Sequence, residues 1–370
     1  MNTQTQSLPN EREYGIDLLR IVAAFYVIVL HTISQGGILD MVLPCSNQLF
    51  TAQIMNSLTF CAVNLYGLIS GYVGYSDTEK PFQPAKLLLL WLEVVFYGVG
   101  INLLFLILLP TSSVSEYWSF ACLPLTKSTY WYFTAYCALF LFIPLLNGCV
   151  RHSSPGNLRF FFLAILLFFS PFENIYSAFG ANRGYSFLWL MILYLCGAIM
   201  KKSRLCQRIH PGLAVFGILL CTAGTCFLRI STGSLWNLDH YTFPLYLISA
   251  MCHLALFARM RIGKLAAKLI CFVAPATFAI YISNVHPLVW WNLIYNRFQE
   301  WAFSSPLGLA IRVVLFSALY VAVVACIDFL RRKLFQILHL RQALDALFAF
   351  LNRTIGILHD FLSAKFRSLA

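Results

Sequence analysis

One apolar stretch, GIDLLRIVAAFYVIVLHT at residues 15–32, contains an acid, a base and an imidazole, which are Asp17, Arg20 and His31. Ionisable groups are costly inside a membrane, so each of them needs a partner or a function. A neutral imidazole can accept a proton from an attacking hydroxyl. An arginine can bind an anion through several N–H groups. Together these side-chain types suit acid–base chemistry on a substrate that carries negative charge.

The spacing places the three side chains on one stripe of a helix, at two heights. Arg20 and His31 are eleven residues apart in the sequence, which returns to within about 20° of the same direction, and Asp17 is about 40° off that line. His31 lies about 16 Å farther along the helix axis than Arg20. Asp17 and Arg20, three residues apart, are expected to pair with each other, so a partner for His31 must come from another helix. The candidates for that partner are Glu93, His286 and Asn64.

Each of these residues also has a purely structural interpretation. Asp17 and Arg20 would then only orient the first helix, and His31 would only form a hydrogen bond between helices. Periodicity alone does not choose between the two roles of His31. Glu93 lies about 12 Å into the third apolar segment, where packing or an ion pair is the favoured role.

The composition predicts the kind of structure that must position these groups. The chain has 370 residues, of which 60% are hydrophobic and 11% are charged, and its mean hydropathy is +0.75. A soluble domain is about 25% charged, so the sequence predicts a polytopic membrane protein. The net charge of +12 is dispersed along the chain, which argues against nucleic-acid binding. The twelve cysteines form no CxxC pair and no Cys/His spacing, so no metal site is expected.

Ten apolar segments approach the length of about 20 residues that a membrane span requires. They cover roughly 16–35, 53–74, 85–109, 130–150, 158–172, 185–200, 211–229, 241–258, 270–294 and 306–330. With the N-terminus in the cytoplasm, the inner loops carry most of the lysines and arginines, as in KKSRLCQR at 201–208, whereas each outer loop carries one or none. By the positive-inside rule this alternation predicts an all-α bundle of about ten transmembrane helices, with both termini cytoplasmic.

A different pattern follows the last span. Residues 334–366 carry large apolar residues seven positions apart, with arginines and aspartates between them. This predicts an amphipathic helix on the cytoplasmic leaflet, and a coiled-coil contact in a homodimer is the alternative. The expected domains are a cytoplasmic tail at 1–14, a transmembrane domain at 15–330 and the cytoplasmic helix at 331–370.

The first span resembles that of the membrane acyltransferase-3 family. The family carries Asp-x-x-Arg and then a histidine separated from the arginine by ten residues, which correspond here to Asp17, Arg20 and His31. Two further segments, GYSFLWLMILYLCGAIMKK and ATFAIYISNVHPLVW, are similar to spans in the branch of the family found in Gram-positive bacteria. The order and spacing of the motifs together make the resemblance specific.

Two shorter motifs extend the resemblance. AVNLYGLISGYVGY is similar to the family's apolar run that ends in Ser-Gly-Phe/Tyr, and TYWYF resembles its Trp-Tyr/Phe motif. The residues that match are Ser70, Gly71, Tyr72, Trp131 and Tyr132. Many members continue with a pair of arginines, but here SDTEKPFQPAKLLLLW has only Lys80 and Lys86. Lysines bind phosphate as point charges, without the two-pronged geometry of arginine.

The resemblance implies O-acyl transfer, usually of acetyl, from cytoplasmic acyl-CoA to a hydroxyl of a cell-envelope glycan or lipid-linked sugar. The enzyme would lie in a bacterial plasma membrane, with acyl-CoA and a carbohydrate as its partners. The catalytic residues would be His31 as general base, with Asp17 and Arg20. Donor contacts would come from Arg20, Lys80, Lys86 and Ser70. Acceptor contacts would come from Asn64, Tyr72, Trp131, Tyr132, Glu93 and His286.

Other functions and other uses of the aromatic segments remain open at this level. TYWYF and PLVWWNLIY have the composition of an aromatic belt at the membrane interface, and a platform on which sugars stack is the alternative. Buried Asp, Arg and His also suit a proton-coupled transporter or a glycolipid flippase. A third function is the membrane half of a two-component system that supplies acyl groups to a separate extracytoplasmic transferase.

Overall fold

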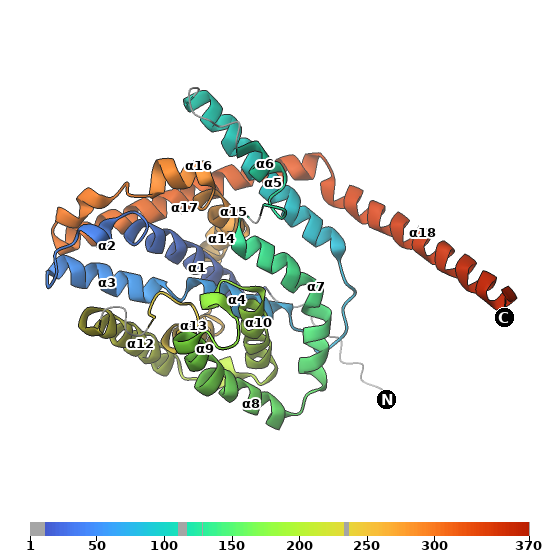
Figure 1. Cartoon of the computed structure of the whole chain (residues 1–370), viewed down its shortest axis with the longest axis horizontal. Coiled ribbons are helices and arrows are strands. Elements are labelled where there is room, and N and C mark those ends of the chain that lie inside the picture. The colour runs from blue at the N-terminus through green and yellow to red at the C-terminus, as the bar shows by residue number, and fades with distance from the viewer. Residues whose placement is uncertain (1–11, 110–116, 128, 233–236, 370) are drawn as a thin grey trace.

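The computed structural model describes residues 12–109, 117–127, 129–232 and 237–369, and within these ranges the chain forms helices and no strands. The bundle is built from α1 (Tyr14–Ile33), α3 (Asn47–Thr59), α4 (Ala62–Gly74), α5 (Pro84–Leu108), α7 (Trp131–His152), α8 (Pro155–Ala164), α9 (Ser170–Tyr176), α10 (Phe187–Lys202), α12 (Pro211–Thr232), α13 (Pro244–Phe257), α14 (Lys264–Val273), α15 (Thr277–Asn284) and α17 (Pro306–Ile337). Short helices connect them, namely α2 (Ile38–Met41), α6 (Trp118–Cys122), α11 (Leu205–Arg208) and α16 (Pro287–Val289). Figure 1 shows their arrangement.

The helices confirm the prediction of an all-α polytopic bundle. Among the described residues, eight helical segments are long and apolar enough to cross a bilayer. The sixth and eighth predicted spans form the shorter helices α10 and α13, of 16 and 14 residues. Each of the ten predicted spans therefore coincides with a helix. The side of the membrane on which the two termini lie stays a prediction.

Serine residues begin several of these helices in the same way. Ser46, Ser154, Ser186 and Ser305 each accept a hydrogen bond from the backbone N–H three residues later. In two of them, Ser154 and Ser305, a proline occupies the first helical position. Such N-caps satisfy backbone donors that a helix start leaves free, and proline suits a position that needs no donor.

The first helix lies at the centre of the bundle. It packs against α3, α4, α13, α14, α15 and α17, and Figure 1 shows it between α3 and α17. Its residues Leu19, Ala23 and Ile28 are fully or almost fully buried. The stripe that carries the predicted site is thus surrounded by protein on most sides.

Helices α4 and α10 make the closest backbone contact around this core. A Cβ atom placed on Gly71 would lie 1.9 Å from the carbonyl oxygen of Tyr194, and one placed on Gly197 would lie 2.0 Å from the carbonyl oxygen of Leu68. Both positions therefore require glycine. Small residues at helix contacts allow such close approach in membrane bundles.

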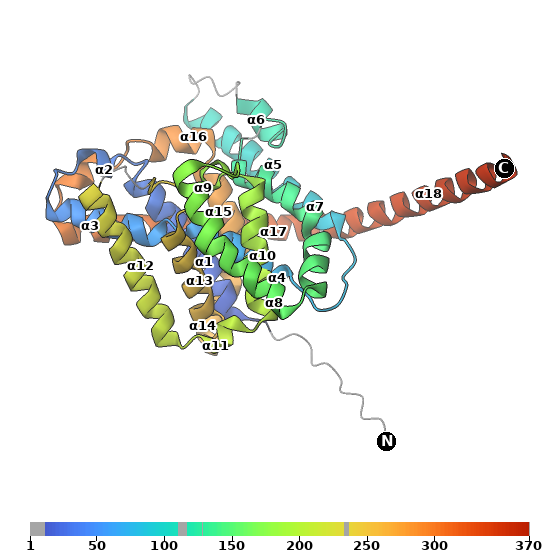
Figure 2. The same cartoon turned by 60° about the horizontal axis from the view of Figure 1, so that its bottom comes forward.

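The helix predicted after the last span starts later than expected. Helix α17 continues to Ile337, past the predicted boundary at 330, and α18 (Leu340–Leu369) begins after a left-handed residue, His339, with φ of 49°. Figures 1 and 2 show α18 projecting away from the bundle. Its apolar residues Phe350 and Ile355 are exposed. Its location on a leaflet or in a coiled coil stays a prediction.

Candidate active site

His31 receives a hydrogen-bonding partner from a distant part of the chain. Its Nδ1 lies 2.5 Å from Oδ1 of Asn284, the last residue of α15. The ring of Trp290 meets the imidazole edge-on, with centroids 5.2 Å apart. Because the amide oxygen can only accept, Nδ1 must carry the proton, and Nε2 then keeps its lone pair. With Asn284 as acceptor, the lone pair of His31 lies on Nε2.

Asn284 was not among the partners proposed from the sequence. It stands two residues before His286, in the same YISNVHP segment. Pro287 begins a new helix, so α15 ends at Asn284 and its last side chain faces α1. The signal that could have identified it was a polar amide at the end of a helix broken by proline.

The three partners considered from the sequence have other contacts. Asn64 is fully buried, and its amide donates to the carbonyl of Tyr241 and accepts from the indole N–H of Trp189, both at 2.9 Å. His286 caps α16, because its Nδ1 accepts from the backbone N–H of Leu288. The hydrogen bonds of these residues fix helices rather than the imidazole of His31.

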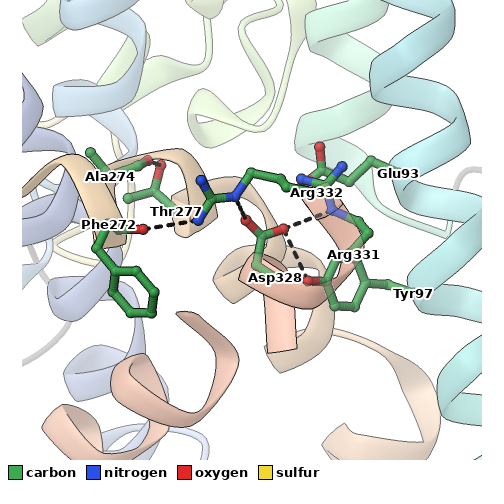
Figure 3. Close-up of polar contacts among 8 residues, drawn as sticks. All are labelled: Glu93, Tyr97, Phe272, Ala274, Thr277, Asp328, Arg331 and Arg332. Atoms are coloured by element: carbon green, nitrogen blue, oxygen red, sulfur yellow. Dashed lines mark hydrogen bonds and ion pairs between the residues drawn. The ribbon is translucent and has the colours of Figure 1, made fainter. Parts of the chain in front are cut away.

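Glu93 belongs to a buried ion-pair cluster that joins α5 to α17. Its carboxylate lies 3.4 Å from the guanidinium of Arg331, as Figure 3 shows. Asp328 is fully buried and accepts from Arg331 at 2.7 Å, from Arg332 at 2.8 Å and from Tyr97 at 3.1 Å. This agrees with the ion-pair role expected for Glu93, and its contact to an acceptor stays a prediction.

The predicted pair at the start of α1 is confirmed. Nη1 of Arg20 donates to Oδ1 of Asp17 at 2.7 Å. The second carboxylate oxygen of Asp17 accepts from Nε of Arg12 at 2.6 Å, a contact that the sequence did not reveal. Asp17 is thus buried between two arginines, which satisfy its charge.

A cavity of about 1460 Å³ connects the Arg20 level of α1 to the His31 level. The predicted site residues in its wall are Arg20, His31, Ser70, Lys80, Lys86, Trp131 and Tyr132. The wall formed by the described residues does not include Asp17, Asn64, Tyr72, Glu93 or His286. The Lys201 ammonium lies over the ring of Tyr72, 5.5 Å from its centroid.

The middle of the cavity is lined by tyrosines that sequence reasoning largely missed. The ring of Tyr132 lies 5.9 Å from that of Tyr66, 6.4 Å from that of Tyr136 and 5.7 Å from that of Tyr281. The hydroxyl of Tyr66 is buried and has no hydrogen-bond partner. The hydroxyl of Ser70 donates to the backbone carbonyl of Tyr66 at 2.8 Å. The Tyr66 hydroxyl is therefore a free donor beside the cavity.

Three aromatic rings form a wall of the cavity farther from Arg20. Trp131 lies 4.8 Å from Tyr185 and 6.3 Å from Tyr241, with the latter pair stacked. All three residues line the cavity. Trp131 therefore faces inward, as a stacking platform requires and an outward aromatic belt does not. In the second aromatic segment Trp290 faces the cavity, whereas Trp291, which also lines it, remains 53% exposed.

The apolar helices are those of a multi-pass membrane protein, and the cavity between them is partly open. The family model described as an acyltransferase domain matches residues 13–332. The chain belongs to the acyltransferase 3 family. Searches of curated proteins and of solved structures found no match. Within the described ranges, no three His, Cys, Asp or Glu side chains come together in a way that could hold a metal ion.

Proposed function

We propose that this membrane acyltransferase transfers an acyl group, acetyl by the resemblance to its family, from cytoplasmic acyl-CoA to a hydroxyl of a cell-envelope carbohydrate. The observation that carries the proposal is that one cavity joins the cations Arg20, Lys80 and Lys86 to His31. Acyl-CoA has an anionic nucleotide end and a long thioester arm. Phosphates at the cationic end would leave the arm directed along the cavity toward the imidazole.

The geometry at His31 suits general base catalysis. The acceptor hydroxyl would give its proton to Nε2 while its oxygen attacks the thioester carbon. The new C–O bond forms, the C–S bond breaks, and the imidazolium returns the proton to the thiolate of CoA. Asn284 accepts from Nδ1 throughout, so the ring does not rotate between the two proton transfers.

The negative charge that develops on the thioester oxygen requires a hydrogen-bond donor. Four side chains come into question for this role, namely Asn64, Ser70, Tyr66 and Tyr132. The amide of Asn64 is already bonded at both ends, and the hydroxyl of Ser70 donates to a backbone carbonyl. Tyr66 lines the cavity and has an unpartnered hydroxyl, so it fits best.

The acceptor would bind against the rings of Trp131, Tyr185 and Tyr241. Aromatic walls with a few polar groups are typical of ligand sites, and Asp40 and Asp239 line the same cavity. Sugars offer apolar ring faces for such a wall and hydroxyls for such carboxylates. This combination supports a carbohydrate rather than a purely apolar acceptor.

The test is His31→Ala, assayed for acyl transfer from radiolabelled acetyl-CoA to envelope glycans in membranes. We expect a loss of about 10²–10⁴-fold in rate, the usual contribution of a general base, with unchanged CoA affinity. His253→Ala is the matched control, because this buried imidazole contacts Tyr26 and Ser249 outside the cavity wall. If folded His31→Ala protein transferred the acyl group at the wild-type rate, the role of His31 as general base would be refuted. A wild-type protein that binds no acyl-CoA would favour a transporter or flippase.

A further inference from the structure

Arg151, which was not among the predicted site residues, lines the same cavity as Lys80 and Lys86. It lies in the last turn of α7, and its side chain is 18% exposed. Its Nη1 donates to Oε1 of Glu79 at 2.9 Å. Because Glu79 directly precedes Lys80 in the chain, this pair places the guanidinium beside the loop that carries the lysine.

The guanidinium of Arg151 retains unused hydrogen-bonding capacity. Its Nε is buried and has no hydrogen-bond partner. Its one ion-pair partner, Glu79, has a side chain that is 87% exposed. Exposed ion pairs are weak because water screens and competes for both charges. A ligand can therefore replace Glu79 as the ion-pair partner of Arg151 at little cost in free energy.

The end of α7 does not need the Arg151 side chain for capping. Nζ of Lys202 donates to the backbone carbonyls of Val150, Arg151 and Ser153 at 2.7, 2.9 and 3.2 Å. These bonds satisfy carbonyls that a helix end leaves free, and the ammonium balances the negative end of the helix dipole. The Arg151 guanidinium is thus available to a ligand in the cavity.

The balance of charge at this end of the cavity favours an anionic ligand. Lys80 and Lys86 form no ion pair with any carboxylate of the described residues. Arg20 shares the carboxylate of Asp17 with Arg12, so this group of three side chains keeps a net positive charge. This part of the wall therefore combines two lysines that are unpaired within the described part of the chain, Lys80 and Lys86, with Arg151, whose ion-pair partner Glu79 is exposed.

We infer that Arg151 exchanges Glu79 for a phosphate group of the donor's nucleotide end, and so supplies the two-pronged phosphate contact that the loop after Gly71 lacks. Arg–phosphate pairs of this kind are directional and strong, whereas a lysine contributes charge alone. Glu79 acts as a competitor for the same guanidinium. This inference rests on the proposed function, since it takes CoA as the donor.

The test compares binding of CoA with binding of pantetheine, which has the thiol arm but no phosphate, by titration calorimetry on the full chain in detergent. Arg151→Gln should weaken CoA binding about tenfold or more, as expected for a hydrogen bond to a charged group, and leave pantetheine binding unchanged. Arg151→Lys should recover part of the CoA affinity. Glu79→Gln should bind CoA more tightly than the wild type, because the competing carboxylate is gone.

The outcomes separate the inference from the proposed function. Wild-type CoA affinity in Arg151→Gln would overturn the phosphate contact. A Glu79→Gln variant that binds CoA no more tightly than the wild type would overturn the exchange. If the wild type itself bound pantetheine and CoA equally weakly, the choice of CoA as donor would fail. Unchanged pantetheine binding in each variant shows that the cavity has kept its shape.

Discussion

The bond between Asn284 and His31 can be removed without touching the cavity wall. Asn284 is fully buried, its Oδ1 bonds His31, and its Nδ2 has no hydrogen-bond partner. Asn284→Ala leaves the imidazole N–H unpaired, which costs about 1–3 kcal/mol, but it also removes an unpaired NH₂ group, which offsets part of that cost. We therefore expect a net loss of about 1 kcal/mol in the free energy of unfolding.

The effect on catalysis should be larger than the effect on stability. Without Asn284, the imidazole keeps its edge-on contact with Trp290 but loses the hydrogen bond that fixes its tautomer. A loss of orientation equivalent to about 1.4–2.8 kcal/mol corresponds to a 10- to 100-fold lower kcat. The KM for acyl-CoA should hardly change, because Asn284 is not among the residues that line the cavity. The measurement is steady-state transfer from acetyl-CoA, together with thermal unfolding in detergent.

Asn64→Ala provides the matched control. Asn64 is equally buried but makes two hydrogen bonds, to Tyr241 and Trp189, and none to His31. It should lower the unfolding temperature more than Asn284→Ala while lowering kcat less. Two results would contradict an orienting role of Asn284. One is a wild-type kcat in Asn284→Ala, and the other is a kcat that follows the unfolding temperature across the two variants.

Two further predictions concern the size of the cavity and the buried ion pairs. A Cβ at Gly148 or Gly100 would meet no heavy atom within 4 Å, but only Gly148 lines the cavity. Gly148→Leu should therefore weaken CoA binding about tenfold or more without lowering the unfolding temperature. Gly100→Leu is the control and should change neither the CoA affinity nor the unfolding temperature. Wild-type CoA affinity in Gly148→Leu would contradict this prediction. Asp328→Asn leaves Arg331 and Arg332 without their shared carboxylate, which should cost about 3–5 kcal/mol in the free energy of unfolding. Thermal unfolding of the variant at the wild-type temperature would show that the cluster contributes little.

Much of the fold could be predicted because a membrane-spanning helix is determined by the hydropathy of its own consecutive residues. The ten apolar segments all form helices, including the short α10 and α13. Helix ends were harder to place, since α17 continues past residue 330 to Ile337. In this continuation Arg331 pairs with Glu93 of α5, a tertiary contact that no local pattern contains.

The candidate site was predictable in part, from helix geometry within α1 and from the family resemblance, which named residues outside α1 that line the cavity, among them Ser70 and Trp131. Helical geometry gave the pair of Asp17 with Arg20 and the separate height of His31. Which side chain reaches His31 depends on how a proline-broken helix packs against α1, so Asn284 could not be identified. Arg151 escaped notice for a similar reason, because it reaches the cavity from the far end of α7.

The backbone contact between α4 and α10 restricts how the enzyme can be adapted to other acyl groups. On its other face α4 supplies Tyr66 and Ser70 to the cavity. Since Gly71 and Gly197 leave no room even for a methyl group, that wall cannot move outward, nor can a smaller residue be introduced behind it. A longer acyl chain would have to be accommodated by trimming side chains on the opposite helices, such as Leu90 of α5 and Phe140 of α7. Engineering of acyl-chain length should therefore begin with α5 and α7 and leave the glycine contact intact.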